Sequence, residues 1–145
     1  MTQIDRSALV DYSAQDMYAL AEDIESYPQF LPWCAGAEYA SREADRTVAT
    51  LHINFHGFRS QFTTENIHQP GKRIDMNLLS GPFRSLQGSW SFTDLGKDAS
   101  KVEFSLRYEF KNPLLEAAVG RVFRSIAETF VEAFVQRADG KFGRK

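Results

Sequence analysis

Features that define several common protein classes are scarce in this sequence. It contains one cysteine, Cys34, which excludes an internal disulfide and is compatible with a reducing compartment. No stretch approaches the ~18 consecutive apolar residues of a membrane-spanning helix, and residues 1–7 lack the basic and apolar regions of a secretory signal. We therefore expect a cytoplasmic protein, with peripheral contact at the inner membrane as an alternative.

Motifs for catalysis and metal binding are also missing. There is no G-x-S-x-G, P-loop or G-x-G-x-x-G pattern. His52 and His56 share a strand face, but four residues of strand span ~13 Å, which is too far for one zinc ion. Cys34 has no histidine near it in sequence and is interpreted as a buried thiol, while His68, beside Gln69-Pro70, is interpreted as part of a turn. We expect no enzyme activity, no metal and no catalytic cofactor.

Charge is nearly balanced overall but unevenly distributed along the chain. The net charge is -2, yet residues 1–70 carry four Lys or Arg against ten Asp or Glu, whereas residues 120–145 carry six against three. This basic end either contacts an anionic partner, such as ribosomal RNA or a lipid surface, or is simply a solvated helix face. The residues that would make a ribosomal contact are Arg137, Lys141, Arg144 and Lys145.

Large aromatic residues are abundant, with twelve Phe and two Trp. Apolar residues alternate strictly with polar ones from Val102 to Phe110, which predicts a strand with one buried face. Asn112 and Pro113 then predict the start of a long helix, whose apolar residues recur at three- and four-residue steps to Phe134. Because this helix needs an apolar partner, we expect the sheet and the helix to face each other across an aromatic interior.

The remainder of the chain predicts a strand, two short helices and further strands. The first strand spans residues 4–12, a helix follows over 14–23, and the proline-broken segment 25–34 predicts a short helical turn. Further strands are expected at 47–55, 58–66, 74–79 and 85–92. The prediction is one α+β domain over residues 1–145, with six to seven antiparallel strands curved round a long C-terminal helix and two short helices after the first strand.

The inward-facing residues of these elements define a candidate ligand site. Alternation predicts which residues face inward but leaves open whether the interior is a filled core or a hollow tunnel. The candidates on the sheet side are Phe55, Phe62, Met76, Leu78, Phe83, Leu86, Trp90, Phe104 and Leu106. Those on the helical side are Trp33, Val122, Phe123, Ile126 and Phe130.

Several segments, in this order, resemble one family over Tyr12 to Ala138. They are Ser26–Cys34, Gly81-Pro82-Phe83 followed by Leu86, Gly88, Trp90 and Phe92, and Ala133-Phe134 with Arg137-Ala138. The chain is similar to the coenzyme-Q-binding and RatA-type proteins of the START-like superfamily, which is related to polyketide cyclases and dehydrases. The resemblance implies a helix-grip fold with an apolar tunnel between the sheet and the C-terminal helix.

Two functions are implied by this resemblance. The first is binding of ubiquinone, a polyprenyl quinone, as a carrier or chaperone that supports respiration. The alternative is a toxin that binds the large ribosomal subunit and blocks subunit association. The cyclase relationship implies an enzyme, but the sequence offers no acid-base pair for it. We expect an apolar small molecule as partner, the ribosome as a second one, and no DNA.

Overall fold

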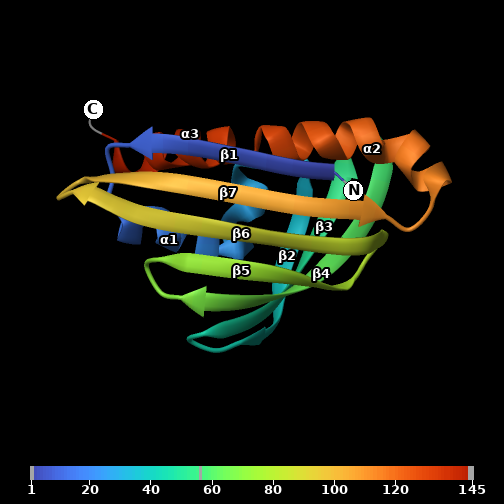
Figure 1. Ribbon diagram of the computed structural model, residues 1–145, viewed down its shortest axis with the longest axis horizontal. Helices are drawn as coiled ribbons and strands as arrows, with labels where there is room; N and C mark the ends of the chain where they lie inside the picture. The colour runs from blue at the N-terminus through green and yellow to red at the C-terminus, as the bar shows by residue number, and fades with distance from the viewer. Residues whose placement is uncertain (1, 56, 144–145) are drawn as a thin grey trace.

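The fold is one curved antiparallel sheet wrapped round the C-terminal helices (Figure 1). The computed structural model describes residues 2–55 and 57–143, with the backbone alone for Phe55. The elements in chain order are β1 (Thr2–Val10), α1 (Ala14–Glu22), η1 (Ile24–Gln29), β2 (Cys34–Arg42), β3 (Arg46–Phe55), β4 (Phe58–Gln69), β5 (Arg73–Ser80), β6 (Phe83–Gly96), β7 (Ala99–Phe110), α2 (Pro113–Glu128) and α3 (Phe130–Phe142). The predicted α+β helix-grip architecture is confirmed.

Strand order in the sheet is β1-β7-β6-β5-β4-β3-β2, so over the described residues seven strands pair antiparallel. Strands β2 to β7 follow each other as consecutive hairpins, and β1 pairs with β7 along its whole length, from Thr2 opposite Tyr108 to Val10 opposite Ser100. Strand β2, at the far edge, is the one that no alternation pattern indicated. Its side chains alternate only between half-buried and exposed from Ala37 to Arg42, and its pairing with β3 has two register shifts.

Two glycines make the tight connections around β5. Gly71 lies between β4 and β5 with φ 77°, and Gly81 lies between β5 and β6 with φ 147°, a range that favours glycine. A Cβ atom on Gly81 would come within 2.6 Å of the Cβ of Phe62. The connection therefore needs glycine both for its backbone conformation and for its close approach to β4.

The two short helices pack at one end of the sheet. Ser13 caps α1 by accepting a hydrogen bond from the Asp16 backbone N–H at 3.1 Å. The predicted helical turn in the proline-broken segment is confirmed as the 3-10 helix η1. Its Tyr27 is buried, donates a hydrogen bond to the Ala21 carbonyl at 2.5 Å, and packs edge-on against Phe134 at 5.3 Å.

The C-terminal helix is not the single uninterrupted helix that the periodicity predicted. It is capped by Asn112, whose side chain accepts from the Leu115 N–H at 2.9 Å, but it divides into α2 and α3 at Thr129. The Thr129 hydroxyl donates to the Ser125 carbonyl at 2.9 Å. A threonine that bonds back to the preceding turn in this way bends a helix. Apolar spacing continues across the bend, which is why the pattern did not reveal it.

Candidate ligand-binding site

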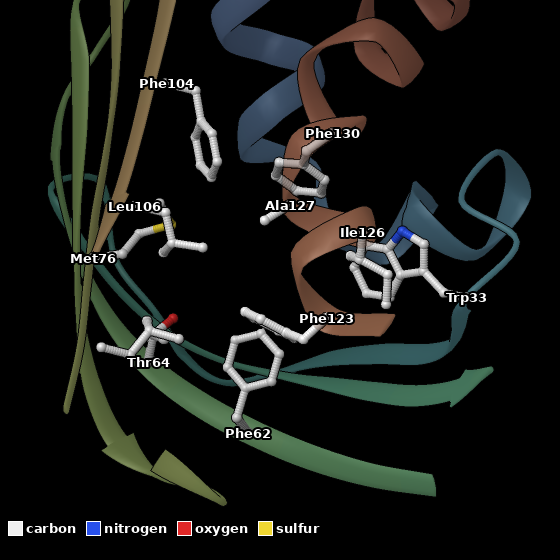
Figure 2. A pocket seen from close by; sticks show the side chains of 11 residues that line it. Trp33, Phe62, Thr64, Met76, Phe104, Leu106, Phe123, Ile126, Ala127 and Phe130 are labelled. Atoms are coloured by element: carbon white, nitrogen blue, oxygen red, sulfur yellow. The ribbon is translucent and has the colours of Figure 1, made fainter. Parts of the chain in front are cut away.

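A pocket lies between the concave face of the sheet and the bend of the C-terminal helix (Figure 2). Its cavity measures about 70 Å³, and the empty space around its lining atoms measures about 540 Å³ when the solvent at its open mouth is included. Ten of its eleven lining side chains are apolar. They are Trp33, Phe62, Met76, Leu86, Phe104, Leu106, Phe123, Ile126, Ala127 and Phe130, and the eleventh is Thr64.

The volume sets a limit on what the pocket holds. Its cavity of about 70 Å³ is small beside typical small-molecule sites, which measure roughly 300 to 1,000 Å³. A ring therefore needs the open mouth or a movement of the lining side chains, and a long polyprenyl tail has to leave through the mouth.

Small residues keep the space open on both walls. Ala127 points into the pocket from α2, where a larger residue would reach toward the sheet (Figure 2). On the opposite wall, a Cβ atom on Gly88 of β6 would lie 2.8 Å from the Met76 methyl carbon and 3.2 Å from a Leu106 methyl carbon. Met76 and Leu106 therefore occupy the room that a side chain at position 88 would take, and both line the pocket.

Nine of the fourteen residues predicted for the ligand site line this pocket. They are Trp33, Phe62, Met76, Leu86, Phe104, Leu106, Phe123, Ile126 and Phe130. Phe55 belongs to β3, but its side chain is outside the described part of the chain. Thr64 and Ala127 were not among the predicted residues. Thr64 continues the inward alternation of Phe62, and Ala127 follows Ile126 on the helix, but small and polar residues carry little signal in an apolar pattern.

Four predicted residues do not line the pocket. Trp90 is 2% exposed and packs behind the pocket wall, with its ring centroid 4.9 Å from those of Phe104 and Phe134. Phe83 is buried and stacks on Phe110 at 5.0 Å. The other two, Leu78 and Val122, are only partly buried. Leu78 borders a second depression together with Arg84 and Arg107. Correct facing on a strand thus did not guarantee contact with the pocket.

The interpretation of His68 as part of a turn is wrong. His68 lies within β4, is 7% exposed, and is bonded through Nδ1 to the Tyr18 hydroxyl and through Nε2 to the Thr47 hydroxyl, both at 2.9 Å. Burial lowers the pKa of His68, so the ring is neutral near pH 7. Thr64, Asn66 and His68 all face inward because they are two residues apart on one strand.

The other reactive side chains stand apart from the pocket. Cys34 is buried, and that burial raises the pKa of its thiol, which does not favour a nucleophilic thiolate. His52 contacts Glu38 at 2.9 Å on the exposed side of the sheet, and His56 lies outside the described residues. Across residues 2–55 and 57–143, no group of three or more His, Cys, Asp or Glu is arranged to hold a metal.

The basic C-terminal residues differ in their surroundings. Arg137 donates to the Gln29 side-chain oxygen at 2.7 Å and lies over the Phe30 ring at 5.1 Å, so it holds α3 against η1. Lys141 is exposed, and Arg144 and Lys145 lie outside the described residues. In the part of the chain that the structure covers, none of the helices has the length and apolar character needed to cross a membrane.

Comparison with known families agrees with this geometry. Residues 10–135 match the family described as polyketide cyclase / dehydrase and lipid transport. A START superfamily protein from Mycobacterium smegmatis has the same fold, with a TM-score of 0.80 and 22% identity over 95% of this chain and 97% of that one. The chain belongs to this polyketide cyclase / dehydrase and lipid transport family, and within it to the RatA-type group.

Two curated relatives carry different names. The ribosome association toxin RatA of Escherichia coli (strain K12) is 45% identical over 138 residues, which cover 95% of this chain and 87% of that protein. The mitochondrial coenzyme Q-binding protein COQ10 of Drosophila melanogaster is 27% identical over 142 residues, which cover 95% of this chain and 59% of that protein. The two names describe different activities for proteins of similar sequence.

Proposed function

We propose that the protein binds a ring-bearing apolar lipid of the polyprenyl quinone class, ubiquinone being the member we expect, in the pocket between the sheet and the C-terminal helix. The observation that carries this proposal is the pocket itself, which is lined by ten apolar side chains and one hydroxyl. A pocket of this composition favours a largely apolar ligand with few polar groups. The similarity to a protein named for coenzyme Q binding supports the same class.

Hydrophobic burial would supply most of the affinity. Each methylene-sized group that leaves water for the pocket contributes about 0.8 kcal/mol. The aromatic rings of Trp33, Phe62 and Phe130 offer faces and edges on which a flat ring can pack. The proposed role is non-enzymatic: the protein carries or protects the quinone in the cytoplasm and meets the inner membrane peripherally to exchange it.

The proposal is tested by titrating the protein with a short-chain ubiquinone analogue while following tryptophan emission. Trp33 lines the pocket and Trp90 lies behind its wall, so saturable quenching at one ligand per chain is expected, with the larger share from Trp33. Trp33→Phe should therefore reduce the quenched amplitude and leave a saturable signal from Trp90. Quenching that rises linearly, as it does for free tryptophan amide, would contradict the proposal.

A second candidate function is association with the large ribosomal subunit and interference with subunit joining. The observation that favours it is the 45% identity with a ribosome association toxin over almost the whole chain. The contact would use the exposed Lys141 together with Arg144 and Lys145. Arg137 is a weaker candidate, because it is already engaged with Gln29 and Phe30.

Co-sedimentation with purified large subunits at increasing salt tests this second function. Changing Lys141, Arg144 and Lys145 to Gln should weaken association steeply, because each phosphate contact releases counterions. The control changes three other lysines, Lys72, Lys97 and Lys111, to Gln and alters the net charge equally. If the two triple variants behave alike, or if association does not depend on salt, the basic end is not the contact surface.

A further inference from the structure

A continuous row of buried polar side chains runs from α1 to the pocket. His68 joins the Tyr18 hydroxyl to the Thr47 hydroxyl at 2.9 Å on each side. The Asn66 amide then bonds to the Thr47 oxygen at 3.3 Å and to the Thr64 hydroxyl at 2.8 Å. Of these five residues, Thr64 alone lines the pocket, and Figure 2 shows its oxygen turned toward the open space.

The row is costly for a protein to maintain. Each of the five side chains is less than 9% exposed. A buried polar group loses its hydration, and a network of this kind contributes to stability only when every member is bonded. Apolar residues of similar shape could fill the same space without that requirement. A polar row that ends at an otherwise apolar pocket therefore indicates a function for its last residue, which faces the pocket.

The chemistry of the row permits two directions of donation. A neutral imidazole has one N–H and one acceptor nitrogen, so one hydroxyl beside His68 donates to it and the other accepts from it. In one direction Thr64 donates to Asn66, Asn66 to Thr47, and Thr47 to His68. Thr64 then offers only lone pairs to the pocket. Turning the amide of Asn66 over and exchanging the tautomer of His68 reverses every bond, and Thr64 then offers its O–H.

We propose that the Thr64 hydroxyl is the polar contact for the ligand and that the row behind it, through His68, lets this hydroxyl either donate or accept. The pocket therefore takes an apolar ring that carries a carbonyl or a hydroxyl group, and it accepts both members of a quinone and quinol pair. This inference rests on the proposed binding of a ring-bearing lipid. It adds the atom that recognises the ring and the reason why either redox form is bound.

The first test compares three probes by calorimetry under nitrogen: a pentyl-substituted benzoquinone, the corresponding quinol, and pentylbenzene, which has no oxygen. Thr64→Val keeps the shape and removes the hydroxyl. It should weaken binding of the quinone and of the quinol by about three- to tenfold, the range of one hydrogen bond, and change pentylbenzene binding by less than about twofold. The matched control is Thr63→Val, on the same strand but bonded to Thr50 at 2.7 Å away from the pocket. It should leave all three affinities unchanged.

The second test examines the direction of donation. In His68→Phe, the Thr47 hydroxyl loses His68 Nε2 as its acceptor and therefore donates to the Asn66 side-chain oxygen. The Asn66 amide N–H then donates to Thr64, which leaves the Thr64 O–H to point into the pocket as a donor. The variant should keep its affinity for the quinone and lose affinity for the quinol by about fivefold or more, since an unpaired buried donor is costly. A purely structural role of His68 would weaken all three probes together.

The outcomes separate this inference from the function on which it rests. If the wild type binds pentylbenzene as tightly as the quinone, or if Thr64→Val weakens all three probes equally, the pocket binds apolar molecules but Thr64 is not the polar contact. If His68→Phe leaves the ratio of quinone to quinol affinity unchanged, the row does not set the direction. If the wild type binds none of the probes, the proposed function itself fails and this inference fails with it.

Discussion

Replacing Ala127 with Leu tests whether the pocket between α2 and the sheet is empty. Ala127 points into the pocket, and Leu adds three carbon atoms to a cavity of about 70 Å³ that opens to solvent. Burial of three carbons contributes up to about 2.4 kcal/mol, and loss of Leu rotamer freedom costs about 0.5 to 1 kcal/mol. We expect the free energy of unfolding to rise by about 1 to 2 kcal/mol.

The matched control is Ala138→Leu on the same C-terminal helical region. Ala138 is 0% exposed and does not line the pocket, so the added carbons have no space and should destabilise the protein by about 1 to 3 kcal/mol. Equilibrium urea unfolding followed by circular dichroism measures both changes. Ala127→Leu should also weaken quinone binding at least tenfold. If both variants destabilise the protein alike, the interior is a filled core and the reasoning from the pocket is wrong.

Three further predictions concern the pH response, a helix cap and the sheet wall. Burial lowers the pKa of His68, so the unfolded chain takes up a proton at this residue first as the pH falls below about 6.5. The free energy of unfolding of the wild type should therefore fall by up to about 1.4 kcal/mol per pH unit from this group. Urea unfolding between pH 7 and 5 should show a shallower loss for His68→Gln, and parallel curves for the two proteins would contradict this. Asn112→Ala should lower the free energy of unfolding by about 1 kcal/mol, because Asn112 caps α2. Gly88→Leu should push Met76 and Leu106 into the pocket and abolish quinone binding while costing about 1 to 3 kcal/mol; retained binding would mean that the ligand lies elsewhere.

Much of the fold was predictable from the periodicity of apolar residues in the sequence. Strict alternation in β6 and β7 and the Asn112-Pro113 start of α2 were enough to place the sheet against the helix, because both signals depend on local geometry. The bend at Thr129 was not predictable in this way, because it depends on a hydrogen bond from the Thr129 hydroxyl to the Ser125 carbonyl rather than on which helix face is apolar. Strand β2 lies at the sheet edge, and half-buried residues such as Ala37 and Ser41 carry little apolar signal in the sequence.

The lining of the pocket was predictable in its apolar part and not in its polar part. Residues such as Phe104 and Leu106 were found because they are large and face inward. Trp90 satisfied the same rule, but whether an inward residue reaches a cavity or packs behind it depends on its neighbours in three dimensions. The buried polar row was missed because His68 stands beside a turn and Thr47 on a different strand, and only pairing of β3 with β4 brings them together.

The most direct measurement is mass spectrometry of an organic extract of the protein purified from its native host without added lipid. Binding of a polyprenyl quinone in the pocket predicts a quinone or quinol at close to one molecule per chain, and a marked loss of it from Ala127→Leu purified in parallel. An extract that contains no quinone, or one whose quinone content is the same in Ala127→Leu as in the wild type, would contradict the account.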